Sequence, residues 1–272
     1  AFVEFLQTPE AQEILPKYGF RPLDDAADVS EYLNEDVGID PKQPAVTLPR
    51  PAPEVVSTAI DQWASIRKPS AILQLIDISG SMDESIGDGR SRLDGAIEGS
   101  AATLGQIRPT DEIGVWAFTT GLTSNIDDQQ VDGIGVVRPF GELGGDKEGL
   151  QNDIEDLANS QRAGTPMYDA ISSAYDYMKT HAEAGRINAI VVLSDGEDTD
   201  SVTRLDTLIQ KINADQKEGG NDKPVRIFAI AYSQAADVEA LEKLARASGG
   251  QVFDATDPEK ITETFQSVMN NF

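Results

Sequence analysis

Apolar and polar positions change their spacing repeatedly along the last two hundred or so residues of the chain. Short, largely apolar runs predict buried strands over 71–76, 113–118, 187–193 and 225–232, and shorter strands are expected over 136–140, at an edge, and over 251–254. Between them, apolar residues recur every three or four positions, which predicts amphipathic helices over 93–104, 167–178, 205–212, 238–245 and 261–268.

This alternation predicts an α/β fold: a doubly wound, mostly parallel sheet with helices on both faces, in a Rossmann-like arrangement. In open sheets of this kind, ligands bind beyond the carboxyl ends of the strands, where the strand order reverses. The loops that follow the predicted strands are therefore the first place to look for a functional site.

The first seventy residues follow a different pattern. Residues 1–22 indicate short helical pieces, one of them with Thr8 as N-cap and Pro9 at its first position. Prolines then concentrate over 41–53, and a helix is expected over 54–68. We therefore divide the chain into a helical remnant (1–40), a proline-rich linker with a packing helix (41–69) and an α/β domain (70–272).

Composition excludes several classes of function. Asp and Glu number 47 against 22 Lys and Arg, so the formal charge of −25 argues against nucleic acid and anionic lipid as partners. The absence of cysteine excludes disulfides, thiolate metal sites and cysteine nucleophiles, and the single histidine, His181, excludes a multi-histidine site. No apolar run reaches the roughly 20 residues that span a bilayer, so direct membrane insertion is not expected.

Oxygen-bearing side chains follow two of the predicted strands. Asp77, Ser79 and Ser81 come directly after the first strand, with a glycine between the serines that permits a tight turn. Asp195 follows the strand over 187–193, and Thr165 precedes the helix over 167–178. Two carboxylates and three hydroxyls suit a hard cation such as Mg²⁺, with Mn²⁺ or Ca²⁺ as alternatives, and disfavour zinc or copper.

This set resembles the metal-ion-dependent adhesion site of von Willebrand factor type A domains. The order Asp77-x-Ser79-x-Ser81, Thr165, Asp195 matches, segment 164–170 resembles the second loop of the family, and segment 193–198 resembles the third. The likeness covers about residues 70–272. It implies that the three hydroxyls contact the metal, that Asp77 and Asp195 do so directly or through water, and that one coordination position is left for a partner's acidic side chain.

Other acidic residues near the site allow alternatives. The insert over 83–88 is longer and more acidic than the family pattern requires; we expect a solvated loop, against a second cation or a crowded open position. Asp169 is either an acceptor that orients Thr165 or a metal-bound water, or else an exposed helix carboxylate. Glu197, Asp198 and Asp200 lack EF-hand spacing, so a solvated, helix-capping loop is preferred to a calcium site.

The function that follows is a metal-dependent binding module for a protein or polymer with an exposed acidic group, outside the cell or in its envelope. An intracellular regulator that engages an ATPase or chelatase partner is the alternative. We do not expect an enzyme: a metal-assisted phosphatase of the haloacid dehalogenase type would need Asp where Ser79 stands, and a serine hydrolase would need a Gly-x-Ser-x-Gly elbow.

Residues 1–22 resemble the last segment of bacterial extracellular solute-binding proteins. The chain also begins without a Met and with helical residues, so we expect a longer protein in which an upstream domain and any export signal precede it.

Overall fold

The computed structural model describes residues 5–23, 31–34, 36, 51–58, 67–87, 89–159, 163–217 and 223–271. The chain forms two compact units, Ala1–Ile66 and Arg67–Phe272, which are described separately. In the first unit, helix α2 (Pro9–Ile14) begins where the sequence predicts, because the Thr8 side chain accepts a hydrogen bond from the Ala11 N–H. A 3₁₀ turn, η1 (Leu15–Tyr18), continues it.

The predicted helix over 54–68 is only partly described. Residues 53–58 are helical, 59–66 lie outside the described residues, and 67–69 are not helical, so the prediction was wrong at its C-terminal end. The proline-rich stretch over 41–50 also lies outside the described residues. The proposed division at 40 and 69, and the likeness of residues 1–22 to solute-binding proteins, stay predictions.

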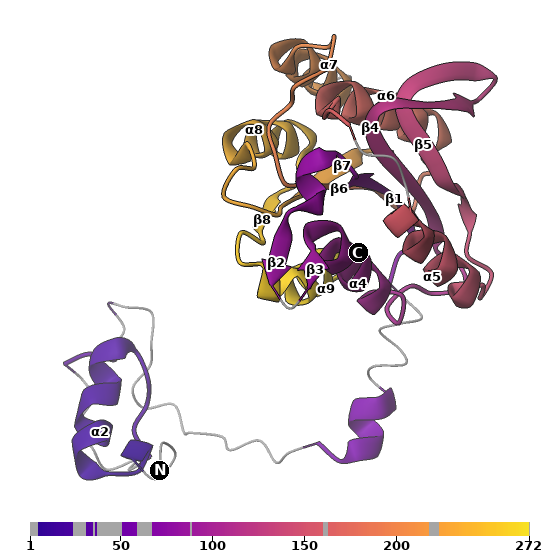
Figure 1. Cartoon of the computed structure of the whole chain (residues 1–272). Helices are drawn as coiled ribbons and strands as arrows, with labels where there is room; N and C mark the ends of the chain where they lie inside the picture. The colour runs from indigo at the N-terminus through magenta and orange to yellow at the C-terminus, as the bar shows by residue number, and fades with distance from the viewer. Residues whose placement is uncertain are drawn as a thin grey trace. The chain divides into compact units, whose positions relative to one another are not determined.

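The second unit is built on one six-stranded sheet with the order β5-β4-β1-β6-β7-β8 (Figure 1). All neighbours are parallel except β4 and β5, which are antiparallel. This confirms the predicted mostly parallel, doubly wound α/β fold. The strands are β1 (Ser70–Asp77), β4 (Glu112–Ile126), β5 (Gln129–Glu142), β6 (Ile187–Ser194), β7 (Val225–Ala231) and β8 (Val252–Asp254).

Helices cover both faces of the sheet, and each face has its own apolar core. Buried residues of α4 (Arg92–Ala102), α5 (Lys147–Glu155) and α9 (Ile261–Met269) belong to one core. Those of α6 (Met167–His181), α7 (Leu205–Lys217) and α8 (Val238–Ser248) belong to the other. Strand β1 contributes to both cores and is buried along its whole length, as its near-continuous apolar run predicts.

The predicted short edge strand over 136–140 is part of a much longer hairpin. Strands β4 and β5 pair over most of their length and are joined by Asp127 and Asp128, both of which have positive φ. Two consecutive positive φ values are the requirement of the two-residue turns that suit the twist of a hairpin, and Asp tolerates them better than most residues do. The sequence pattern missed this turn because neither position is a glycine.

Several further elements were not predicted. Helix α5 buries only Leu150 and Ile154, too few apolar residues for a clear periodic signal. The segment that includes the acidic insert forms a 3₁₀ turn, η3 (Gly80–Asp83), and a small two-stranded sheet of β2 (Ser85–Gly87) and β3 (Arg90–Ser91). Residues 85–87 of the insert thus form a strand rather than a plain loop.

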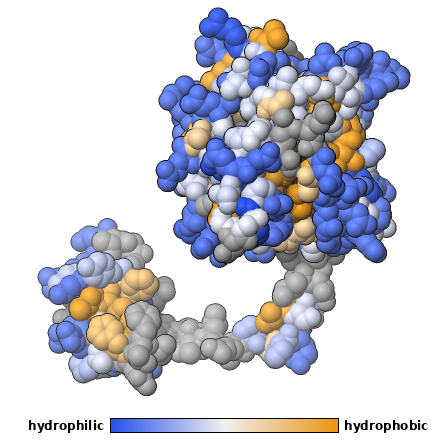
Figure 2. Space-filling view, viewed as in Figure 1, coloured by the Kyte–Doolittle hydropathy of each residue, from blue (hydrophilic) through white to orange (hydrophobic). Residues whose placement is uncertain are grey.

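The surface of the second unit is mainly hydrophilic on the face that Figure 2 shows. The first unit, in contrast, exposes several large apolar side chains: Phe5, Ile14, Phe20 and Leu23. Across the described part of the chain, no helix combines the length and the apolar character that crossing a membrane requires.

Candidate metal centre

The first strand-end loop is organised by the Asp77 carboxylate. Asp77 is the last residue of β1 and is fully buried. Its Oδ1 accepts a hydrogen bond from the Ser79 N–H at 2.8 Å, and its Oδ2 accepts one from the Ser194 hydroxyl at 2.7 Å. The first bond turns the chain sharply after the strand, and the second ties the loop to the end of the neighbouring strand β6.

A chain of hydrogen bonds connects this loop to Asp195. The hydroxyl oxygens of Ser79 and Ser81 lie 3.1 Å apart, and the Ser81 hydroxyl donates to Asp195 Oδ1 at 2.7 Å. Ser79 and Asp195 are buried, whereas Ser81 is partly exposed. The structure therefore brings together Asp77, Ser79, Ser81 and Asp195, as expected from two loops at the carboxyl ends of adjacent parallel strands.

The loop that carries Thr165 is held beside these residues by hydrogen bonds of its backbone. The loop before α6 is attached to the first loop by the Gly80 N–H, which donates to the Ala163 carbonyl at 2.8 Å. It is attached to β4 by Thr119, whose hydroxyl accepts from the Ala163 N–H and donates to the Gly164 carbonyl. The Thr165 side chain is buried, and among the described residues no hydrogen-bond partner is found for its hydroxyl.

The acidic loop after Asp195 caps helix α6. The Asp200 carboxylate and the Thr199 hydroxyl accept from the Thr165 N–H, and the Asp198 carboxylate accepts from the Tyr168 N–H. These bonds supply acceptors to N–H groups at the start of the helix, which have no partner within it. The structure agrees with the helix-capping interpretation of Asp198 and Asp200.

Asp169 has a role that the sequence did not suggest. Its two carboxylate oxygens accept hydrogen bonds from the Val202 and Thr203 N–H groups at 2.8 and 2.9 Å. No hydrogen bond joins Asp169 to Thr165 among the described residues, and its carboxylate is partly buried, so neither an acceptor for Thr165 nor a merely exposed carboxylate describes it. Its proposed role as an acceptor for a metal-bound water stays a prediction. The loop over 198–203 caps the start of α6, and Asp169 of α6 in turn accepts hydrogen bonds from the backbone of that loop.

Removal of the Asp169 carboxylate leaves two backbone donors without acceptors. We expect Asp169→Ala to lower the free energy of unfolding by about 1–2 kcal/mol. Urea unfolding of this variant beside the exposed α6 control Asp176→Ala checks this. Equal stability of the two variants would contradict the capping role.

Burial dominates the electrostatics of the Asp77 carboxyl. It raises the pKa of the Asp77 carboxyl to about 6, and the nearby Asp195 carboxylate adds to the rise. Hydrogen bonds from Ser79 and Ser194 favour the charged form but do not cancel the effect of burial. Two buried carboxylates side by side form a site that attracts positive charge.

Comparison with known proteins identifies the fold and the family. The profile of the von Willebrand factor type A domain matches residues 72–267. The chain belongs to the von Willebrand factor type A family. A search of the curated proteins gives no match.

Solved structures share the fold at low sequence identity. A von Willebrand factor type A protein from Catenulispora acidiphila is 20% identical with a TM-score of 0.57, over 74% of this chain and 42% of that one. Proximal thread matrix protein 1 from the mussel byssus, with a zinc-occupied MIDAS motif, is 13% identical with a TM-score of 0.54, over 74% and 47%. The pilus adhesin SpaC from Lactobacillus rhamnosus GG is 11% identical with a TM-score of 0.52, over 76% and 31%. This chain thus spans less than half the length of these proteins.

The donor set of this von Willebrand factor type A domain fits a hard divalent cation. Among the described residues, no group of three or more His, Asp or Glu side chains is placed to hold a metal. The centre instead combines two buried carboxylates with the hydroxyls of Ser79, Ser81 and Thr165. Oxygen ligands of this kind suit Mg²⁺ or Mn²⁺, and two carboxylates balance the charge of the ion.

Sequence reasoning missed Arg92, the first residue of α4. Its guanidinium donates to Asp195 Oδ2 at 2.8 Å, and its other terminal nitrogen lies 2.6 Å from Glu84 Oε2. A cation at the first position of a helix is unfavourable for the helix dipole, so its presence there was a signal of another role. The acidic insert is thereby connected to the site through Glu84.

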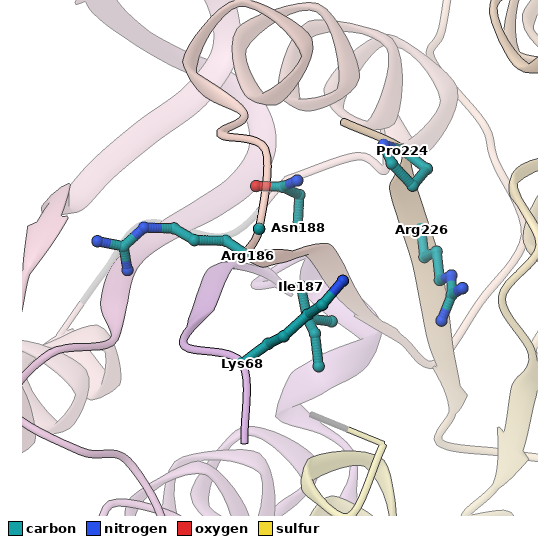
Figure 3. A pocket seen from close by; sticks show the side chains of 7 residues that line it. Lys68, Arg186, Ile187, Asn188, Pro224 and Arg226 are labelled. Carbon is teal, nitrogen blue, oxygen red and sulfur yellow. The ribbon is translucent and has the colours of Figure 1, made fainter. Parts of the chain in front are cut away.

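A cavity of about 110 Å³ lies at the opposite end of the sheet. Figure 3 shows that the Arg186 side chain points away from Lys68 and Arg226, and its guanidinium binds Glu183 and the Thr110 carbonyl. No candidate metal ligand lines this cavity, which is therefore separate from the metal centre. Its lining residues are Lys68, Gly185, Arg186, Ile187, Asn188, Pro224 and Arg226.

Proposed function

We propose that this domain is a divalent-metal-dependent binding module. One ion, Mg²⁺ or Mn²⁺, is held among Asp77, Ser79, Ser81, Thr165 and Asp195. The observation that carries the proposal is the convergence of these residues, from three loops, at the carboxyl end of the sheet, with both carboxylates buried. When bound, the ion supplies a positive centre that accepts an anionic oxygen.

The ligand that suits such a centre is a carboxylate on a protein or polymer. A protein with a formal charge of −25 repels acidic partners at long range, so a cation is needed to bind one. The pilus adhesin and the byssal matrix protein, which share the fold, support an adhesive role outside the cell or in its envelope. The proposal assigns no catalytic activity.

Metal titration with a Thr165 variant tests the proposal. We expect protein freed of metal with EDTA to bind one Mn²⁺ or Mg²⁺ in calorimetry, and Thr165→Val to weaken this binding about tenfold or more, because one ligand is lost. Since the Thr165 hydroxyl has no hydrogen-bond partner among the described residues, the variant should keep the melting temperature of the metal-free protein.

Thr180→Val is the control, because Thr180 lies near the C-terminal end of α6, the helix that Thr165 precedes, and is exposed, with its hydroxyl donating only to the Asp176 carbonyl of its own helix. It should bind metal as the wild type does. Failure of the wild type to bind Mg²⁺, Mn²⁺ or Zn²⁺ would refute the metal centre. Equal affinity of Thr165→Val and the wild type would remove Thr165 from the ligand set.

A further inference from the structure

Arg92 neutralises a carboxylate that the proposed metal centre uses. Asp195 is fully buried, and its Oδ2 accepts a hydrogen bond from Arg92 Nη1 at 2.8 Å. The Arg92 side chain is itself 18% exposed, so the ion pair lies largely out of solvent. An arginine stays charged at every pH at which the protein is folded, and pairing strongly stabilises a buried carboxylate.

The same guanidinium has a second partner that lies in solvent. Its Nη2 is 2.6 Å from the Glu84 Oε2, and the Glu84 side chain is 62% exposed. The backbones of the two residues are also joined, because the Arg92 N–H donates to the Glu84 carbonyl at 2.9 Å. Arg92 is thus shared between a buried carboxylate in the site and an exposed carboxylate in the insert.

We propose that Arg92 is a built-in counter-cation of the metal centre and that its charge lowers the affinity of the centre for divalent cations. Glu84, which pairs with the same guanidinium, reduces this effect of Arg92. The inference rests on the proposed function. The fixed positive charge of the Arg92 guanidinium beside Asp195 repels a divalent cation at the site, while it stabilises the metal-free protein. Glu84 draws part of this positive charge toward solvent and so favours the metal-bound form.

The test compares two pairs of ionic residues in the same segment. Arg90 pairs with Glu98 at 2.7 Å on the surface, with both side chains well exposed, and has no contact with the candidate ligands. Arg92→Gln and Arg90→Gln therefore change the net charge equally but affect the site differently. The same holds for Glu84→Gln and Glu98→Gln. Each variant is stripped with EDTA and titrated with Mn²⁺ in a calorimeter at fixed ionic strength.

We expect Arg92→Gln to bind Mn²⁺ about tenfold more tightly than the wild type. Arg90→Gln should stay close to the wild type, since a surface charge this exposed is screened. Without metal, Arg92→Gln should melt at a lower temperature, because Asp195 loses its partner. Equal or weaker binding by Arg92→Gln would overturn the inference.

Glu84→Gln keeps the inference testable if Arg92→Gln does not fold. We expect this variant to bind Mn²⁺ about threefold more weakly, because the guanidinium is left to Asp195 alone, whereas Glu98→Gln should be unchanged. Tighter binding by Glu84→Gln would overturn the inference. If the wild type and all variants fail to bind any divalent ion, the proposed function itself falls, and the inference with it.

Discussion

Asp77→Asn should raise the melting temperature of the metal-free protein at pH 7.5 by about 6–12 °C. The pKa of Asp77 rises from 3.8 to about 6 on folding, and each pKa unit corresponds to about 1.4 kcal/mol, so the buried charge destabilises the fold by about 3 kcal/mol. A domain of this size gains about 2–4 °C for each kcal/mol. Asparagine keeps the shape of the side chain and can hydrogen-bond Ser79 and Ser194.

The same shift predicts how stability depends on pH. In the folded state Asp77 holds its proton up to about pH 6, whereas in the unfolded chain it loses it near 3.8. The penalty is therefore fully present above pH 6, decreases as the pH falls toward 4, and is absent below that value. The advantage of Asp77→Asn should shrink accordingly between pH 7 and pH 4.

Thermal melts of both proteins across this pH range, in EDTA, measure the effect. Glu242→Gln, which removes an exposed charge from helix α8, is the control and should change the melting temperature little. A saturating divalent cation should stabilise the wild type but not Asp77→Asn, because only the wild type retains both carboxylates. A variant that melts below the wild type at pH 7.5 in EDTA would contradict the charge argument.

Gly250→Ala is expected to destabilise the domain by about 3 kcal/mol or more. Gly250 follows helix α8, and a methyl group there would overlap the Ile227 carbonyl oxygen and lie 2.7 Å from its carbon. These are backbone atoms within strand β7, so they cannot rotate away as a side chain would. The turn or the strand must shift, and the pairing of β8 with β7 shifts with it.

The measurement is urea unfolding followed by far-ultraviolet circular dichroism. Gly105→Ala is the matched control, because a methyl group at Gly105 meets nothing within 4 Å and the residue has no positive φ. Its unfolding midpoint should stay near that of the wild type. If both alanine variants unfold at the same urea concentration, close packing at Gly250 is not what excludes a side chain.

Much of the fold could be predicted because its central strands are buried on both faces. Strands β1 and β6 read as largely apolar runs, which are typical of parallel strands covered by helices on both faces. The hairpin of β4 and β5 was harder to predict, since its far half is exposed and its turn uses Asp127 and Asp128 rather than glycine. Apolar residues mark only those strands that are buried, so exposed strand segments leave no such signal in the sequence.

The candidate site could be predicted as far as its residues follow a strand end. Asp77, Ser79, Ser81 and Asp195 lie together because parallel strands deliver their loops to one edge of the sheet. Arg92 could not be placed in this way, because its position depends on how the insert folds back toward Asp195. Ion pairs between segments distant in sequence leave no periodic signal.

The mutual caps of helix α6 and the loop after β6 have a mechanical consequence. Residues 164–169 and 198–203 exchange hydrogen bonds in both directions, including one from the Thr199 N–H to the Thr165 carbonyl. Thr165 therefore cannot shift alone: a displacement of its backbone pulls on the segment that leads into α7. We therefore expect the two segments to move as one unit relative to the first loop, which carries Ser79 and Ser81.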